Sequence, residues 1–131
     1  MAEGGGHKII ILDDDDFLVQ MYVTKFSNSG IEISAFKSGQ DLLEKLKGGE
    51  KADLLLLDIV IPNMTGLEVL REMRKEKLLE GVPVVMLTNQ NDSKDIEEAK
   101  ALGIAGYIVK SAATPSEVVA EVLKIINNSK H

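Results

Sequence analysis

Residues 8–18 read KIIILDDDDFL: an apolar run leads into four consecutive aspartates, and the chain then turns apolar again. The run at 9–12 has the length and the continuous apolar character of a parallel strand that is buried on both faces. Four adjacent carboxylates repel one another, and burial makes their charge still more unfavourable. The aspartates therefore form either a solvated turn or one wall of a site that holds a cation.

Similar runs recur along the chain and alternate with helical patterns. Three more buried strands are predicted at 54–57, 84–87 and 107–109. Alternation of apolar and polar residues over 31–35 predicts an edge strand. Because each strand is followed by a helical pattern, we expect an α/β fold with five helices: a doubly wound, flavodoxin-like, five-stranded parallel sheet with strand order 2-1-3-4-5.

The helical patterns have recognisable starts and a buried face. Capping residues mark four helix starts, at Ser38, at Thr65 with Glu68, at Asp92 or Ser93, and at Thr114 with Pro115 and Glu117. The first helix carries an apolar stripe of Leu18, Met21, Tyr22 and Phe26. Spacing also places Met21, Met73 and Met86 in the core, where methionine commonly packs.

Composition limits the classes of function. With 131 residues, the chain is expected to form one domain at 8–128, after a flexible leader at 1–7 and before a short tail at 129–131. It has no cysteine, and its net charge of −6 argues against direct nucleic-acid binding. No apolar stretch is long enough to span a membrane, so we expect a cytoplasmic protein. His7 and His131 are interpreted as inert terminal residues.

Four of the five predicted strands end in a polar residue. Asp13 and Asp14 follow the first strand, Asp58 ends the third, Thr88 the fourth and Lys110 the fifth. Taken alone, each has an ordinary explanation as a turn residue, a helix cap or a solvated charge. Because ligands bind at the carboxyl ends of parallel strands, the set predicts one crevice with three carboxylates, a hydroxyl and an ammonium.

Such a crevice suits phosphoryl chemistry. Clustered carboxylates raise one another's proton affinity unless a cation compensates them, and Mg²⁺ (or Mn²⁺) is the natural compensator. A carboxylate beside the metal can act as a nucleophile and form an aspartyl phosphate, which the metal and the ammonium stabilise. Asp15 and Asp16 instead fall at the start of a helix, where negative charge suits the helix dipole.

Four motifs together resemble the response-regulator receiver domains of bacterial two-component signalling. They are IIILDD at 9–14, LLLLDIVIPNMTG at 54–66, VVMLT at 84–88 and GYIVK at 106–110. The resemblance covers nearly the whole chain. It implies a phosphoryl-accepting switch, here of the single-domain, stand-alone type, although a receiver cut from a longer protein would look the same.

The resemblance also implies a role for each site residue. Asp58 would be the phosphoacceptor, and Lys110 would pair with its carboxylate or with the phosphate. Asp14 would bind the metal directly, Asp13 would bind it through a water, and the main-chain carbonyl of Val60 would be a further ligand.

Two more residues would form the switch. Thr88 would contribute its hydroxyl and Tyr107 its aromatic ring, and the alternative for Tyr107 is a half-buried core residue. The phosphoryl donor would be a sensor histidine kinase or a phosphotransfer protein. The face made by the fourth helix, the fifth strand and the fifth helix would bind a downstream effector, or the phosphoryl group would pass on in a relay. The chain would not be an enzyme beyond catalysing its own phosphorylation and dephosphorylation.

Three positions depart from the family pattern. Asn89 replaces a small residue and is expected to restrict access to Asp58. Ser111 replaces a proline, so the loop at 111–114 is expected to follow another path with a trans bond. Val60 cannot orient a hydrolytic water by hydrogen bonding, so we expect slow loss of the phosphoryl group.

Three other classes of protein are alternatives to a phosphoryl-accepting receiver. A phosphorylation-independent interaction module with a receiver fold is the main alternative, and the intact carboxylates, threonine and lysine argue against it. An aspartyl-phosphate phosphatase needs a second aspartate two residues after the nucleophile, where this chain has Val60. A flavodoxin needs a phosphate-binding loop with free N–H groups after the first strand, where this chain is acidic.

Overall fold

The buried runs form one parallel sheet. The structure is a computed structural model that describes residues 7–89 and 93–128. Its strands are β1 (Lys8–Leu12), β2 (Glu32–Phe36), β3 (Leu54–Asp58), β4 (Val84–Thr88) and β5 (Gly106–Val109). They lie in the order β2-β1-β3-β4-β5, and every pair is parallel. The predicted fold class and strand order are confirmed.

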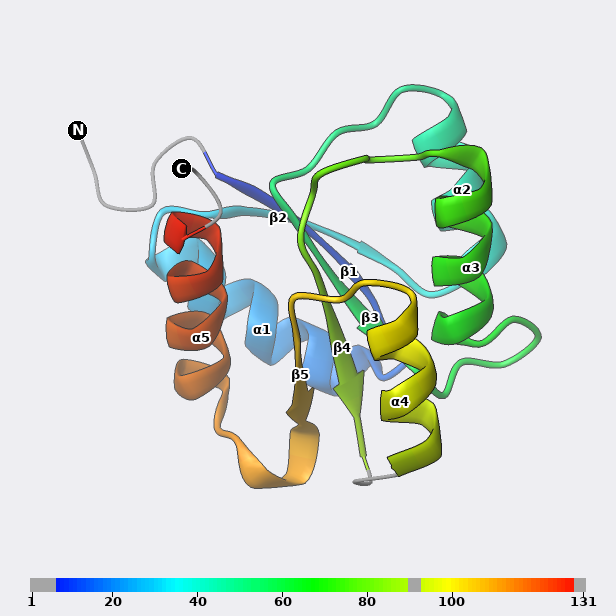
Figure 1. The fold of residues 1–131 in the computed structure, drawn as a ribbon. Coiled ribbons are helices and arrows are strands. Elements are labelled where there is room, and N and C mark those ends of the chain that lie inside the picture. The colour runs from blue at the N-terminus through cyan, green and yellow to red at the C-terminus, as the bar shows by residue number, and fades with distance from the viewer. Residues whose placement is uncertain (1–6, 90–92, 129–131) are drawn as a thin grey trace.

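Five α-helices cover the two faces of the sheet, as predicted for a doubly wound fold. They are α1 (Asp16–Asn28), α2 (Gly39–Lys47), α3 (Gly66–Glu76), α4 (Ser93–Ala101) and α5 (Pro115–Asn128). Figure 1 shows α1 and α5 on one face and α2, α3 and α4 on the other. A short 3₁₀ turn, η1 (Lys110–Ala112), follows β5 and was not predicted. No peptide bond among the described residues is cis, as expected with Ser111 in that turn.

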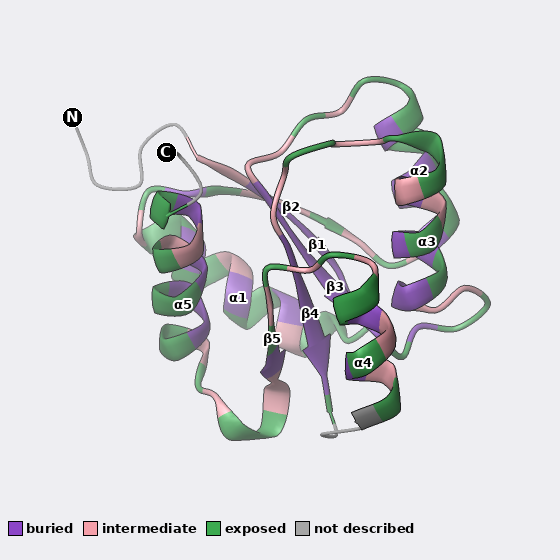
Figure 2. Cartoon of the chain, in the orientation of Figure 1, coloured by how far each residue is buried: buried purple, intermediate pink, exposed green. Residues whose placement is uncertain are grey.

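The sheet separates two apolar clusters, which explains the continuous apolar runs. In β1, Ile9 and Ile11 pack in the cluster that contains Tyr22 and Val122, whereas Ile10 and Leu12 pack in the other. The strands β3 and β4 are divided in the same way and are buried throughout (Figure 2). A strand with neighbours on both sides and helices on both faces has no solvent-exposed position, so polar residues appear only at its end.

The predicted caps form hydrogen bonds. Thr65 and Glu68 make a reciprocal capping box, with N···O distances of 3.1 and 2.8 Å. Thr114 and Glu117 make the same arrangement at α5, at 2.8 and 3.2 Å. The hydroxyl oxygen of Ser38 accepts a hydrogen bond of 3.3 Å from the amide of Asp41. The predicted start at Asp92 lies outside the described residues.

The packing of α1 differs from the predicted stripe. Met73 and Met86 are fully buried, as predicted, but Met21 is 37% exposed, so its assignment to the core was wrong. Val19 is buried instead, together with Tyr22 and Phe26. Successive helical residues point about 100° apart. Since Tyr22 faces the sheet, Met21 beside it turns toward the edge of the interface.

The ends of the chain are described only in part. The predicted leader and tail lie outside the described residues except for His7, whose carbonyl accepts a hydrogen bond of 3.1 Å from the main chain of Glu32. His7 therefore lies against the edge strand. None of the helices in the described part of the chain combines the length and the apolar character that a bilayer crossing needs.

One glycine lies where no side chain fits. A Cβ atom at Gly66 would lie 2.1 Å from the main-chain oxygen of Asp58, and the amide of Gly66 donates to the carbonyl of Ile59 at 3.0 Å. Both contacts involve main-chain atoms, so no flexible side chain can move away. The first residue of α3 thus fixes the end of β3.

We predict that Gly66→Ala lowers the free energy of unfolding by about 1–3 kcal/mol, since overpacking against a fixed backbone has that cost. Urea denaturation would measure it. Gly48→Ala is the matched control, because its Cβ would meet the Lys45 oxygen at an ordinary 3.4 Å and its φ of −80° suits alanine. Equal stability of the two variants would contradict the prediction.

Candidate functional site

The polar strand ends meet where the strand order reverses. Because β1 lies between β2 and β3, the crevice at the carboxyl ends of β1 and β3 is the ligand position of a doubly wound sheet. Asp13 and Asp14 extend from β1, and Asp58 is the last residue of β3. One carboxylate oxygen from each of the three lies within 4.8 Å of the others. The predicted three-carboxylate cluster is therefore present.

A single ammonium joins the two buried carboxylates. Asp13 and Asp58 are 0% and 2% exposed, whereas Asp14 is exposed. The Nζ atom of Lys110, which follows β5, lies 2.7 Å from Oδ2 of Asp58 and 2.7 Å from Oδ2 of Asp13. Its side chain is itself only 7% exposed. Two enclosed negative charges thus share one enclosed positive charge.

Main-chain groups fix the remaining oxygens. Oδ1 of Asp58 accepts from the amide of Val60 at 3.1 Å, and Oδ1 of Asp13 accepts from the amide of Asp15 at 3.0 Å. The amide of Asp13 donates to the carbonyl of Phe36 at 3.0 Å, which ties the acidic turn to β2. The carboxylates are therefore oriented before any ligand arrives. The role of the Val60 carbonyl as a metal ligand stays a prediction.

The electrostatics of the pair follow from this enclosure. Burial raises the pKa of the Asp58 carboxyl, Lys110 opposes the rise, and the nearby charge of Asp13 adds to it. For Lys110, burial lowers the pKa of the ammonium, but its contacts with Asp13 and Asp58 outweigh burial and leave the pKa raised. Lys110 therefore stays charged, whereas the buried surroundings of Asp58 disfavour the ionised form of its carboxyl group.

The residues present fit a divalent cation. Three carboxylates face one ammonium, and all of the available donors are the hard oxygens that Mg²⁺ or Mn²⁺ prefers. Oδ2 of Asp13 is enclosed and, apart from its ion pair, makes no hydrogen bond within the described part of the chain. The cluster therefore carries more negative than positive charge, which a divalent cation would balance.

The two residues predicted to form the switch lie on the next strands of the sheet, β4 and β5. Thr88 ends β4 and is 4% exposed, in register with Val109 of β5. Tyr107 on β5 is 40% exposed, and Nζ of Lys100 lies 6.0 Å from the centre of its ring. The structure thus places the threonine inside and the tyrosine outside. The switch roles of Thr88 and Tyr107 stay predictions.

The cluster opens into a hollow of about 390 Å³. Val60, 66% exposed, and Asn89 line its rim together with the carboxylates. Restricted access because of Asn89 and slow phosphoryl loss because of Val60 both stay predictions.

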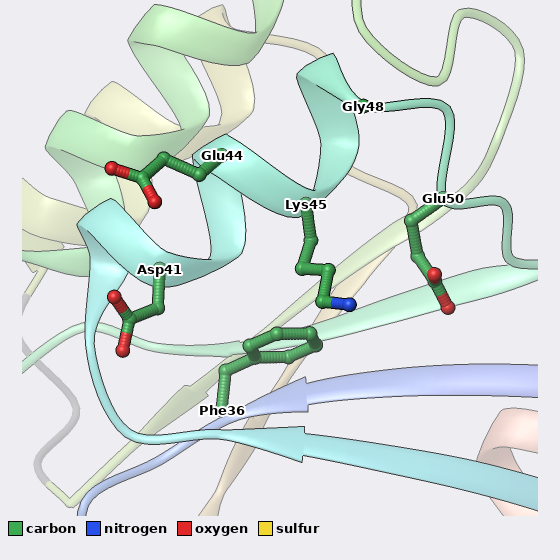
Figure 3. A pocket seen from close by; sticks show the side chains of 6 residues that line it. All are labelled: Phe36, Asp41, Glu44, Lys45, Gly48 and Glu50. Atoms are coloured by element: carbon green, nitrogen blue, oxygen red, sulfur yellow. The ribbon is translucent and has the colours of Figure 1, made fainter.

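A larger hollow, of about 580 Å³, lies between β2 and α2 (Figure 3). There Asp41 and Glu44 are exposed, and Glu50 is paired with Lys8. Exposed or paired acids are common on protein surfaces and carry no desolvated charge. The smaller hollow, with its enclosed carboxylates, is therefore the candidate functional site.

The residues that the sequence interpretation missed are apolar. Phe17 is 78% exposed directly after the acidic turn, and it forms an apolar patch with Met21 and Pro115. Phe17 lies off the buried stripe of α1. A phenylalanine at a solvent-facing helical position is the sequence signal that could have pointed to this patch. A protein that reaches the acidic turn from the side of α1 would contact this patch.

Fold and site together define a doubly wound α/β protein with lysine-bridged carboxylates at the carboxyl edge of its sheet. The family described as response regulator receiver domain matches residues 9–123. The chain therefore belongs to the receiver domains of the response regulators of two-component signalling, and the predicted family is confirmed.

Comparison with known proteins agrees. The alkaline phosphatase synthesis transcriptional regulatory protein PhoP of Bacillus subtilis is 32% identical over 123 residues, which are 94% of this chain and 50% of that protein. The DNA-binding response regulator MtrA of Mycobacterium tuberculosis is 33% identical over 115 residues, 88% of this chain and 48% of MtrA. The chain thus spans about half the length of the curated relatives it matches.

Solved structures show the same architecture. The chemotaxis protein CheY4 of Vibrio cholerae superposes with a TM-score of 0.82 at 25% identity, covering 91% of this chain and 98% of CheY4. The phosphorylated cyanobacterial phytochrome response regulator RcpA gives a TM-score of 0.75 at 25% identity, over 93% of this chain and 89% of RcpA.

We predict that Asp58→Asn raises the free energy of unfolding by about 1 kcal/mol at neutral pH in EDTA, the usual size of a single polar substitution. A raised carboxyl pKa means that the folded state holds the proton more tightly than the unfolded chain. The stability that Asp58 contributes is therefore fully present below its unfolded pKa and is lost as the pH rises through the folded pKa. Asparagine does not ionise, so the Asp58→Asn variant does not lose this stability at neutral pH.

The same denaturation curves with Mg²⁺ complete the test. Mg²⁺ is expected to stabilise the wild type by mass action and to stabilise Asp58→Asn less, because a ligand oxygen has lost its charge. A variant less stable than the wild type in EDTA, or a wild type that does not respond to Mg²⁺, would contradict this account of the site.

Proposed function

We propose that this chain takes a phosphoryl group from a sensor histidine kinase or a phosphotransfer protein onto Asp58, in a reaction that depends on Mg²⁺ or Mn²⁺. The observation that supports it is the enclosure of Asp58 beside Asp13, with Lys110 in contact with both. Charge at this carboxylate is disfavoured by burial, and a metal and an ammonium can take up the charge of an incoming phosphoryl group. The protein would act in the cytoplasm.

In the proposed reaction, a carboxylate oxygen of Asp58 attacks the phosphorus of a phosphohistidine. The P–N bond breaks and the imidazole leaves as the P–O bond forms. Lys110 orients Asp58 and balances charge on the phosphoryl oxygens. A metal bound by Asp13, Asp14, Asp58 and the Val60 carbonyl would stabilise those oxygens further.

Transfer would change the balance of charge around Lys110. A phosphoryl group with up to two negative charges would compete with Asp13 for its ammonium. We propose that the hydroxyl of Thr88 then donates to the phosphate and that Tyr107 follows it inward. The face of α4, β5 and α5 would change its affinity for an effector protein through a shift between two states, or the phosphoryl group would pass on in a relay.

The other classes have less support. The chain is proposed to catalyse only its own phosphorylation and dephosphorylation, since Val60 stands where a phosphatase needs its second aspartate. A phosphorylation-independent module has no use for Asp13, Asp58 and Lys110 at bonding distance in an enclosed place, where unpaired charge costs stability. A net charge of −6 disfavours direct contact of this chain with nucleic acid.

We predict that Mg²⁺ and acetyl phosphate together add the mass of one phosphoryl group, read by intact-mass spectrometry. The adduct should vanish in EDTA and in Asp58→Asn. Asp16→Asn should keep it, because Asp16 is exposed, pairs with Lys37 and lies outside the cluster.

An adduct that persists in Asp58→Asn would place the acceptor elsewhere. No adduct, with no Mg²⁺-dependent binding of beryllofluoride, would reject phosphoryl acceptance and favour the interaction module.

We also predict that Val60→Asn speeds the loss of the phosphoryl group by about three- to tenfold, the effect of one hydrogen bond to the attacking water. Decay of the adduct mass after removal of the donor would measure it. Val60→Ala is the control, because it removes bulk at the same exposed rim position without adding a hydrogen-bonding group. Equal acceleration by both variants would show that bulk, and not hydrogen bonding, sets the rate.

A further inference from the structure

The helix α4 is held by few buried contacts. It has only nine residues, and Ile96 and Ala99 are its buried apolar side chains. It begins shortly after the site strand β4 and ends shortly before β5, on the same face of the sheet as α3 (Figure 1). A short helix with little buried area depends on its polar contacts for its position.

One of these contacts is a fork of two hydrogen bonds from α3. Arg74, in the last turn of α3, donates from Nε to the carbonyl of Leu102 at 2.8 Å and from Nη2 to the carbonyl of Gly103 at 2.9 Å. Carbonyls at a helix C-terminus lack partners within the helix, and a cation there also suits the helix dipole. A guanidinium bonds both from a rigid planar fork, whereas a lysine ammonium is a compact charge whose donors are not held in that geometry.

A second contact lies nearer the middle of α4. Arg71, one turn before Arg74 on α3, forms an ion pair with Glu98. The two side chains are 50% and 36% exposed, so solvent screens the pair and it contributes little to stability. The two arginines therefore hold α4 differently. Arg74 binds its end with two hydrogen bonds, and Arg71 binds its middle with one solvent-screened ion pair.

The spacing of these contacts decides how α4 can move. Glu98 lies four residues before Leu102, about 6 Å along the helix axis, and the start of α4 lies about 7 Å beyond Glu98. A tilt about the Arg74 end would therefore leave Gly103 in place, move Glu98 by an intermediate amount and move the start of α4 most. The start of α4 is the end nearest to Thr88, where a phosphoryl signal would enter.

We propose that Arg74 is the pivot about which α4 moves, and that the Arg71–Glu98 pair restrains α4 in its unphosphorylated position. The proposal rests on the proposed function for its input signal. Arg71 and Arg74 are positioning residues, because neither lies in the acidic site and each acts through α4.

Two consequences follow. Loss of the Arg71–Glu98 pair would lower the free energy needed to move α4, so linkage would tighten binding of a phosphoryl analogue by about two- to fivefold, the range of an exposed ion pair. Loss of Arg74 would release the end of α4 and let the whole helix respond to the analogue.

Amide NMR spectra of the full chain, without ligand and with Mg²⁺ and beryllofluoride, test the proposal in the wild type, Arg74→Gln, Arg74→Lys and Arg71→Gln. In the wild type, shift changes should decrease from the start of α4 to Gly103. In Arg74→Gln they should extend through Gly103, and Arg74→Lys should restore the wild-type gradient only in part. Arg71→Gln should keep the gradient and bind beryllofluoride two- to fivefold more tightly.

Glu98→Gln is the matched partner variant. It should tighten binding as Arg71→Gln does, and the double variant should show no further gain, since both changes remove the same pair. Without ligand, Arg74→Gln alone should increase hydrogen exchange at residues 99–103.

Uniform shift changes along wild-type α4, unaltered exchange in ligand-free Arg74→Gln, or additive effects in the double variant would each overturn the proposal. Failure of every protein to bind beryllofluoride would reject the proposed function, and the ligand-free exchange arm would still decide whether Arg74 fixes the end of α4.

Discussion

The ammonium of Lys110, held between the carboxylates of Asp13 and Asp58, is the interaction on which the site depends. Two enclosed negative charges on neighbouring strands would repel each other and disfavour the junction of β1 with β3. Lys110 comes from beyond β5, and its side chain reaches across the end of β4 to meet them. This contact needs the observed strand order, and it needs a side chain as long as that of lysine. It also passes the strand end at which Thr88 is buried.

Much of this could be predicted because it follows from local rules. Continuous apolar runs require burial on both faces, and that requirement alone predicts parallel strands with helices on either side. Capping motifs such as Thr65 with Glu68 are short-range and were found as predicted. The convergence of Asp13, Asp58 and Lys110 followed from the rule that carboxyl ends of parallel strands share one edge.

What could not be predicted depends on distances between elements. Nothing in the sequence indicates that Lys110 lies as close to Asp13 as to Asp58. The two N···O distances depend on how far β5 lies from β1 in the folded sheet. The rotation of α1 about its axis decides that Val19 packs inward and that Met21 and Phe17 do not, and a few tens of degrees would have reversed this. Likewise, the fork from Arg74 needs the end of α4 beside the last turn of α3.

Main-chain contacts close the segment after Asp58, so its length can change less easily than its exposed side chains. Ile59 and Gly66 close the loop through their main chains, and Gly66 touches the backbone of Asp58 itself. The exposed side chain of Val60 takes no part in that closure, so it can be exchanged while Asp58 keeps its position. An inserted or deleted residue would open the loop and release Asp58. The main chain therefore fixes the number of residues in this segment, whereas an exposed position within it, such as Val60, can change its side chain without moving Asp58.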